Sequence, residues 1–137
     1  MKIRAGFVSN SSSTSFLIIA KSDLNRADFF ELMGISPNSP VADLFSEFYE
    51  SVEENISSTV DFKKVRGDVA PESLIETRRS HLSERMLEKI RDAKKRGFKA
   101  YYGWLDSETS PIQSFFCTDS FEVENEKMYF NGLECTW

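Results

Sequence analysis

Hydrophobic and polar positions alternate near both ends of the chain, a spacing that predicts β-strands. Near the start, residues 3–8 alternate, and residues 16–20 form an apolar run rich in aromatic and β-branched side chains. An asparagine and five consecutive hydroxyl residues separate these two runs. We therefore predict a β-hairpin with a Ser-rich tip at residues 10–14.

The middle of the chain has helical periodicity. A first helix is predicted to begin after Ser22, a suitable N-cap, and to end at Gly34. A second helix is predicted to begin at Ser39 and Pro40. One face of this second helix is apolar, with positions spaced i, i+3, i+4, i+7, i+8 and i+11: Val41, Leu44, Phe45, Phe48, Tyr49 and Val52.

A third helical stretch opens at Pro71 and ends at Gly97. It either runs unbroken or restarts at Ser80 or Ser83, each of which is an acceptable N-cap. Before it, residues 55–70 lack a helical period, and the segment 58–65 suits an edge strand or an extended connection.

From residue 98 onward the chain is strand-like again. The pair Asn131-Gly132 suits a type I′ turn and predicts a hairpin there. The order of strands, helices and strands predicts an α+β fold, in which a mostly antiparallel sheet (an N-terminal hairpin plus a C-terminal meander) is covered by about three helices. We expect the helices to cover one face. Because the opposite face is also apolar, we expect the hairpin, a partner subunit or a ligand to cover it.

Length and charge narrow the function classes. With 137 residues, the chain is expected to form a single domain over 1–137. The net charge of −5 argues against binding to nucleic acid or to an anionic membrane, although the third helical stretch is locally basic. Two cysteines, no signal peptide and no long apolar run predict a cytoplasmic protein without a membrane span.

The opening of the chain resembles a scattered group of uncharacterised microbial and viral proteins. These proteins begin with a basic residue, a Gly-Phe-Val sequence and then Ser-Asn followed by serines and a phenylalanine. The matching positions cover about a tenth of the chain: Arg4, Gly6, Phe7, Val8, Ser9, Asn10, Ser11, Ser12, Ser13, Ser15 and Phe16. The resemblance implies kinship and no particular activity.

The Ser-rich tip is the first candidate binding site. Successive backbone N–H groups in a tight turn, together with hydroxyls, suit an anion, but the segment has no P-loop pattern. A polar turn that contacts a neighbouring subunit or a partner is the alternative. The candidate binding residues are Arg4, Ser9, Asn10, Ser11, Ser12, Ser13, Thr14, Ser15 and Lys21.

Carboxylates form the second candidate surface. Glu47, Glu50 and Glu54 lie on the acidic face of the second helix, which suits either a solvated surface or a basic partner. Glu122 and Glu124 share a strand face and could serve as an acid–base or cation-binding pair, although a solvated strand face is the simpler explanation.

Classical catalytic sets are not predicted. The single histidine, His81, and the cysteines Cys117 and Cys135 lack the spacing of a triad or a zinc site. No cofactor or metal is therefore expected, and an enzyme is the less favoured class.

Three functions follow from these patterns. The first is a non-enzymatic binding or assembly protein that uses the Ser-rich tip to contact a protein partner or a second copy. The second is an anion- or nucleotide-binding enzyme or sensor using the same tip. The third is an acidic, possibly phage-borne, inhibitor that presents Glu47, Glu50 and Glu54 to a basic host protein.

Overall fold

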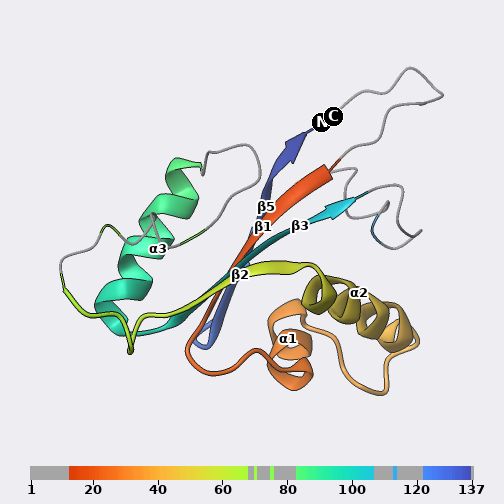
Figure 1. Cartoon of the computed structure of the whole chain (residues 1–137). Coiled ribbons are helices and arrows are strands. Elements are labelled where there is room, and N and C mark those ends of the chain that lie inside the picture. The colour runs from red at the N-terminus through yellow and green to blue at the C-terminus, as the bar shows by residue number, and fades with distance from the viewer. Residues whose placement is uncertain are drawn as a thin grey trace.

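A five-stranded antiparallel sheet separates two layers of helices (Figure 1). The computed structural model describes residues 13–67, 70, 75, 83–106, 113 and 122–136. Within these residues the strands are ordered β2-β3-β1-β5-β4 and the α+β class is confirmed. The strands are β1 (Ser13–Ala20), β2 (Ile56–Asp61), β3 (Lys99–Asp106), β4 (Glu122–Glu124) and β5 (Met128–Thr136).

Strand β1 occupies the centre of the sheet. It pairs with β3 on one side and β5 on the other, so neither edge of residues 16–20 is left for residues 3–8. The predicted N-terminal hairpin pairing is therefore wrong, and Ser13 and Thr14 begin a strand instead of forming a tip. The predicted C-terminal meander is also interrupted, because β1 lies between β3 and β5.

The turn of the C-terminal hairpin lies at residues 125–127, before the predicted position at Asn131-Gly132. Strands β4 and β5 are joined at residues 125–127, where the side chain of Asn125 accepts hydrogen bonds from the backbone of Lys127 and Met128. The pair Asn131-Gly132 continues β5, so the type I′ turn prediction is wrong. The register between β1 and β5 shifts near Gly132, and glycine is a residue that a β-bulge favours.

The sheet is covered on both faces by helices of this chain. Helices α1 (Arg26–Met33) and α2 (Ala42–Glu54) pack on one face, and α3 (Glu84–Arg96) packs on the other (Figure 1). The expectation that the helices cover one face, and that the hairpin, a partner subunit or a ligand covers the other, is therefore wrong. The central strand accordingly has apolar residues on both faces, and all five residues of 16–20 are buried.

Local signals set most helix ends. The left-handed Gly34 and Gly97 end α1 and α3 as predicted, and Ser83 caps α3 by accepting from the Met86 N–H. Helix α1 begins later than predicted, because the side chain of Asn25 accepts from the Asp28 N–H.

Helix α2 begins at Ala42, two residues after the predicted start, and its cap residue makes no side-chain hydrogen bond. Its second half buries Phe48, Tyr49 and Val52 against the sheet as predicted. Val41 and Leu44 remain 41% and 44% exposed, because the beginning of α2 projects beyond the sheet (Figure 1).

The end of α2 passes directly over β3 at Gly103. A Cβ placed on Gly103 would lie 2.1 Å from the Asn55 carbonyl oxygen and 2.8 Å from a ring carbon of Phe16. Next to this point the register between β2 and β3 shifts. Glycine at residue 103 therefore sets how closely the α2 layer approaches the sheet.

Candidate functional site

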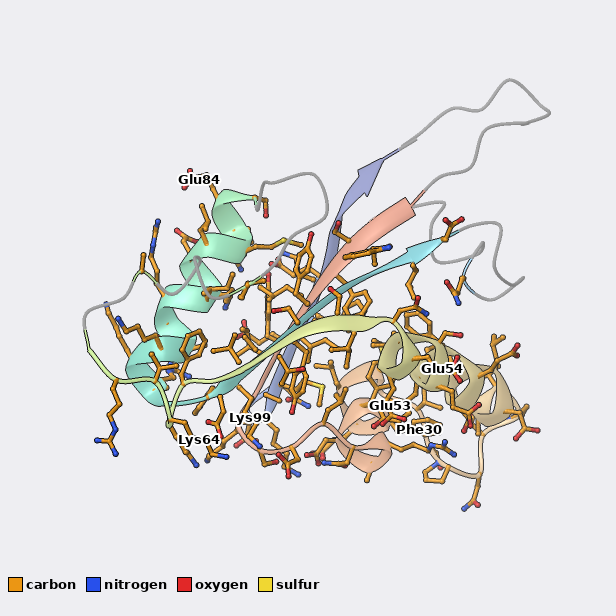
Figure 2. All side chains as sticks on the ribbon, viewed as in Figure 1. Phe30, Glu53, Glu54, Lys64, Glu84 and Lys99 are labelled. Carbon is orange, nitrogen blue, oxygen red and sulfur yellow. The ribbon has the colours of Figure 1, made fainter. Side chains whose placement is uncertain are left out.

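A groove of about 570 Å³ lies between α1 and α2, on the side of the molecule away from α3. Its surface is mostly apolar, and its volume falls within the range of roughly 300–1,000 Å³ typical of ligand pockets. Figure 2 shows Phe30 between the two helices. The apolar lining residues are Ala27, Phe30, Ile35, Pro37 and Ala42.

Charged and polar groups form the rim of the groove. Arg26, Glu31, Asp43 and Ser46 line it beside the apolar residues. The Arg26 guanidinium lies 3.0 Å from a Glu50 carboxylate oxygen, which joins α1 to α2, and it also lies over the ring of Tyr49. These contacts connect α1 and α2 beside the groove.

The predicted acidic residues lie beside this groove. Glu47, Glu50 and Glu54 are all exposed on α2, and Asp43 extends the same row. Helix α2 contains five acidic residues and no basic one, whereas α3 contains six basic residues and three acidic ones. The sheet therefore separates an acidic helical layer from a basic one.

Burial changes the chemistry of one tyrosine in this layer. The Tyr49 hydroxyl donates to Glu53 at 3.0 Å, and Tyr49 is 4% exposed. Burial and this hydrogen bond raise the pKa of Tyr49 to about 12, so the phenol is neutral at physiological pH. It acts as a structural contact between α2 and Phe29, whose ring lies 5.3 Å away.

The Ser-rich candidate site falls mainly outside the described residues. This applies to Arg4, Ser9, Asn10, Ser11 and Ser12, so binding by them stays a prediction. The structure places the other hydroxyl residues, Ser13, Thr14 and Ser15, in β1, where both neighbouring strands pair with them. Their backbone N–H and C=O groups serve the sheet, so these three residues do not form the predicted anion-binding turn.

Lys21 does not join the same site. It follows the other end of β1, eight residues from Ser13, a separation of about 26 Å in an extended strand. There it lines a polar pocket of about 270 Å³ that also contains Asp23, Lys63 and Lys99. An ion pair between Asp23 and Lys99 already balances part of its charge. The sequence predicts that Lys21 supplements an anion site formed by the Ser-rich residues. Because Lys21 and Ser13 lie at opposite ends of β1, this prediction is wrong for the part of the site that Ser13 would form.

The predicted carboxylate pair of Glu122 and Glu124 takes part in a structural network. Arg85 lies 2.8 Å from Glu122, and Lys89 lies 2.9 Å from Glu124, so β4 is tied to α3 by two ion pairs. The Tyr129 hydroxyl also donates to Glu122. Since each carboxylate has a cationic partner, the pair is not arranged as a free acid and base.

The network shifts two pKa values. Burial alone raises the pKa of Glu122, but hydrogen bonds from Arg85 and Tyr129 outweigh it and hold the pKa below its usual range. Burial and the hydrogen bond to Glu122 raise the pKa of Tyr129. The buried amide of Asn131 donates to the Tyr129 oxygen at 2.7 Å, which completes a chain of contacts from the sheet interior to α3.

The other sequence candidates add no site to the described part of the chain. His81 and Cys117 lie outside it, and Cys135 is a strand residue of β5. Within the described residues, no three or more histidine, cysteine or acidic side chains are grouped so that they could hold a metal ion. None of the helices in that same part has the length and apolar character that crossing a membrane requires.

Sequence reasoning found the acidic row but missed the groove. The apolar lining residues Ala27, Phe30, Ile35 and Ala42 come from two helices and their connection, and no single sequence pattern brings them together. The available signal was small: alanines at the edge of an apolar stripe leave space between helices that larger residues would fill.

Comparison with known proteins adds no relative. No protein-family model, curated protein or solved structure matches this chain.

Proposed function

We propose that the chain is a protein-interaction module that docks a basic partner in the α1–α2 groove. The observation that carries this proposal is an open, mostly apolar groove beside an acidic row, in which Asp43, Glu47 and Glu54 have no partner among the described residues. An apolar anchor of a partner would lose water-exposed surface on entering the groove. Lysine or arginine side chains flanking that anchor would meet the acidic row.

The lining residues favour binding over covalent catalysis. The described groove residues include no histidine, cysteine or lysine, so a serine–histidine, cysteine–histidine or lysine-based catalytic set cannot be written from them. The charged lining residues of the groove are exposed, whereas Phe30 is buried and Ile35 and Ala42 are half-buried. This is the usual arrangement of a protein-binding surface, in which a central apolar contact is surrounded by polar residues.

The charge of the layer supports a basic partner. Between residues 26 and 54 the chain has seven acidic residues and one basic residue. A surface with one sign of charge accelerates association with a partner of the opposite sign and disfavours partners of the same sign. The same feature accords with the acidic-inhibitor prediction made from Glu47, Glu50 and Glu54.

A random peptide library displayed on phage tests the proposal. Ala27 is exposed and lines the groove, so Ala27→Trp fills the groove at a position where the core is not disturbed. Lys95→Trp, on an exposed position of α3, is the matched control.

We expect the wild type and Lys95→Trp to enrich peptides that combine lysine or arginine with a large apolar residue. Ala27→Trp should lose these peptides. Enrichment of acidic peptides, or equal binding of the selected peptides to Ala27→Trp, would contradict the proposal.

A further inference from the structure

We infer that the partner segment is an amphipathic basic helix that lies along α2, an inference that rests on the function proposed above. The row of carboxylates on α2 sets the positions of its charges, and the groove receives its apolar side chains.

The carboxylates follow a helical spacing. Asp43, Glu47, Glu50 and Glu54 are separated by four, three and four residues, so they form one line along the exposed side of α2. At a rise of 1.5 Å per residue, this line is about 16 Å long. It borders the groove, because Asp43 lines the groove and Glu50 pairs with Arg26 across it.

These carboxylates are poorly compensated. Among the described residues, none pairs with Asp43, Glu47 or Glu54. Neighbouring like charges at i,i+3 and i,i+4 destabilise a helix. A partner that supplies cations to this line would remove that repulsion.

In the same chain, helix α3 carries basic residues that do have charged partners. Its Arg85 and Lys89, four residues apart, pair with Glu122 and Glu124 of β4. The two cations of α3 are thus neutralised by two carboxylates of the same chain. On α2 the corresponding cations are missing from the described residues, which is consistent with a partner that provides them.

The spacing selects a helix over an extended segment. Carboxylates three or four residues apart on a helix are separated by about 4.5–6 Å along its axis. Side chains on one face of an extended strand recur at about 6.6–6.8 Å, which suits two neighbouring charges on a helix, as Glu122 and Glu124 of β4 do for α3. Over the four carboxylates of the α2 row, a strand loses this register. A second helix has the same repeat as α2, so its lysines or arginines stay opposite the carboxylates.

The groove accounts for the apolar side of the partner. Ala27 and Ala42 are small, and Phe30 forms part of the floor, so a ridge of larger apolar side chains can enter between α1 and α2. Helices pack in this way when the ridge of one helix fits the groove formed by others. The expected partner therefore has adjacent basic and apolar stripes.

A labelled peptide of about 16 residues tests this inference, the length at which an alanine-based helix becomes measurable. It has lysines at i, i+4, i+7 and i+11 and leucines one position after each of the first three lysines. The control peptide has the same composition in an order that spreads the lysines around the helix. Fluorescence anisotropy gives the affinity, and circular dichroism gives the helix content on binding.

We expect the ordered peptide to bind at least about tenfold more tightly than its control and to gain helix on binding. The double variant Glu47→Gln/Glu54→Gln should weaken binding by about three- to tenfold. The matched variant Glu84→Gln/Glu88→Gln, on exposed positions of α3, should leave it unchanged.

The outcomes separate this inference from the proposed function. If both peptides bind equally and both lose affinity for Ala27→Trp, the groove is the docking site but the helical partner is refuted. If binding is the same in wild type, Ala27→Trp and Glu47→Gln/Glu54→Gln, both the inference and the proposed function are refuted.

Discussion

The hydroxyl of Tyr129 donates a hydrogen bond to the carboxylate of Glu122, and this contact joins the interior of the sheet to its edge. Asn131 donates to the same hydroxyl from inside the sheet, while Arg85 of α3 pairs with Glu122 from outside it. The short edge strand β4 is thereby held between β5 and α3. Its stability depends on polar contacts as well as on packing.

Replacement of Tyr129 by phenylalanine should destabilise the protein by about 1–2 kcal/mol, because the buried Asn131 amide and Glu122 each lose the hydrogen bond that they share with the Tyr129 hydroxyl. Urea unfolding followed by circular dichroism gives the change in free energy. Tyr49→Phe is the matched control: its hydroxyl contacts the exposed Glu53, so a smaller loss is expected. Equal losses of unfolding free energy in the two variants would show that the contacts of the Tyr129 hydroxyl with Glu122 and Asn131 stabilise the fold no more than the single contact of Tyr49.

Acid should weaken the protein partly through Glu122. The folded-state pKa of this carboxyl is held below its usual range, so its contribution is fully present above the ordinary pKa and is lost as the pH falls through the lower, folded-state value. The free energy of unfolding should therefore fall more steeply between about pH 5 and pH 3 in the wild type than in Glu122→Gln. Identical slopes would contradict the assigned role of Glu122.

Alkali should weaken the protein through Tyr49. The pKa of this phenol is raised to about 12 in the folded state, so folding favours the protonated form. Its contribution is complete below the ordinary tyrosine pKa of about 10 and is lost as the pH rises toward the folded-state value. Between about pH 9 and pH 12, the free energy of unfolding should fall less in Tyr49→Phe than in the wild type. An equal fall in both proteins would show that Tyr49 does not cause the loss of stability at high pH.

Gly103→Ala should cost about 3 kcal/mol or more, because the new Cβ would meet the backbone of Asn55 and the ring of Phe16. Gly34→Ala provides a contrast, since Gly34 has φ 71° but open space around it, and should cost about 1 kcal/mol. Thermal and urea unfolding of the two variants compare these effects. A Gly103→Ala protein as stable as Gly34→Ala would contradict the close approach of α2 to β3.

The sequence predicted those elements whose signals are local. Gly34, Gly97 and Ser83 set helix ends through their own backbone or side-chain preferences, and the apolar spacing of 48, 49 and 52 set the buried face of α2. The strand order was missed because it depends on long-range pairing. Asn131-Gly132 has ideal turn chemistry, but pairing with β1 and β4 keeps Asn131 in a strand and buries it.

The candidate site likewise has one part that local sequence signals predict and one part that depends on long-range packing. The acidic row was predictable, because the spacing of Glu47, Glu50 and Glu54 lies within one helix. The groove was not, because it requires knowledge of how α1 and α2 pack against each other. Five apolar residues in succession at 16–20 were the available signal that both faces of the sheet are covered.

Amide chemical-shift mapping tests the docking site most directly. ¹⁵N-labelled protein is titrated with the lysine- and leucine-bearing peptide at low salt, and the perturbed amides are located on the fold. The account predicts that the largest changes lie in α1, α2 and their connection, between residues 26 and 54, and that Ala27→Trp suppresses them. Changes centred on α3 or on the edge strand β4, or changes that persist in Ala27→Trp, would contradict it.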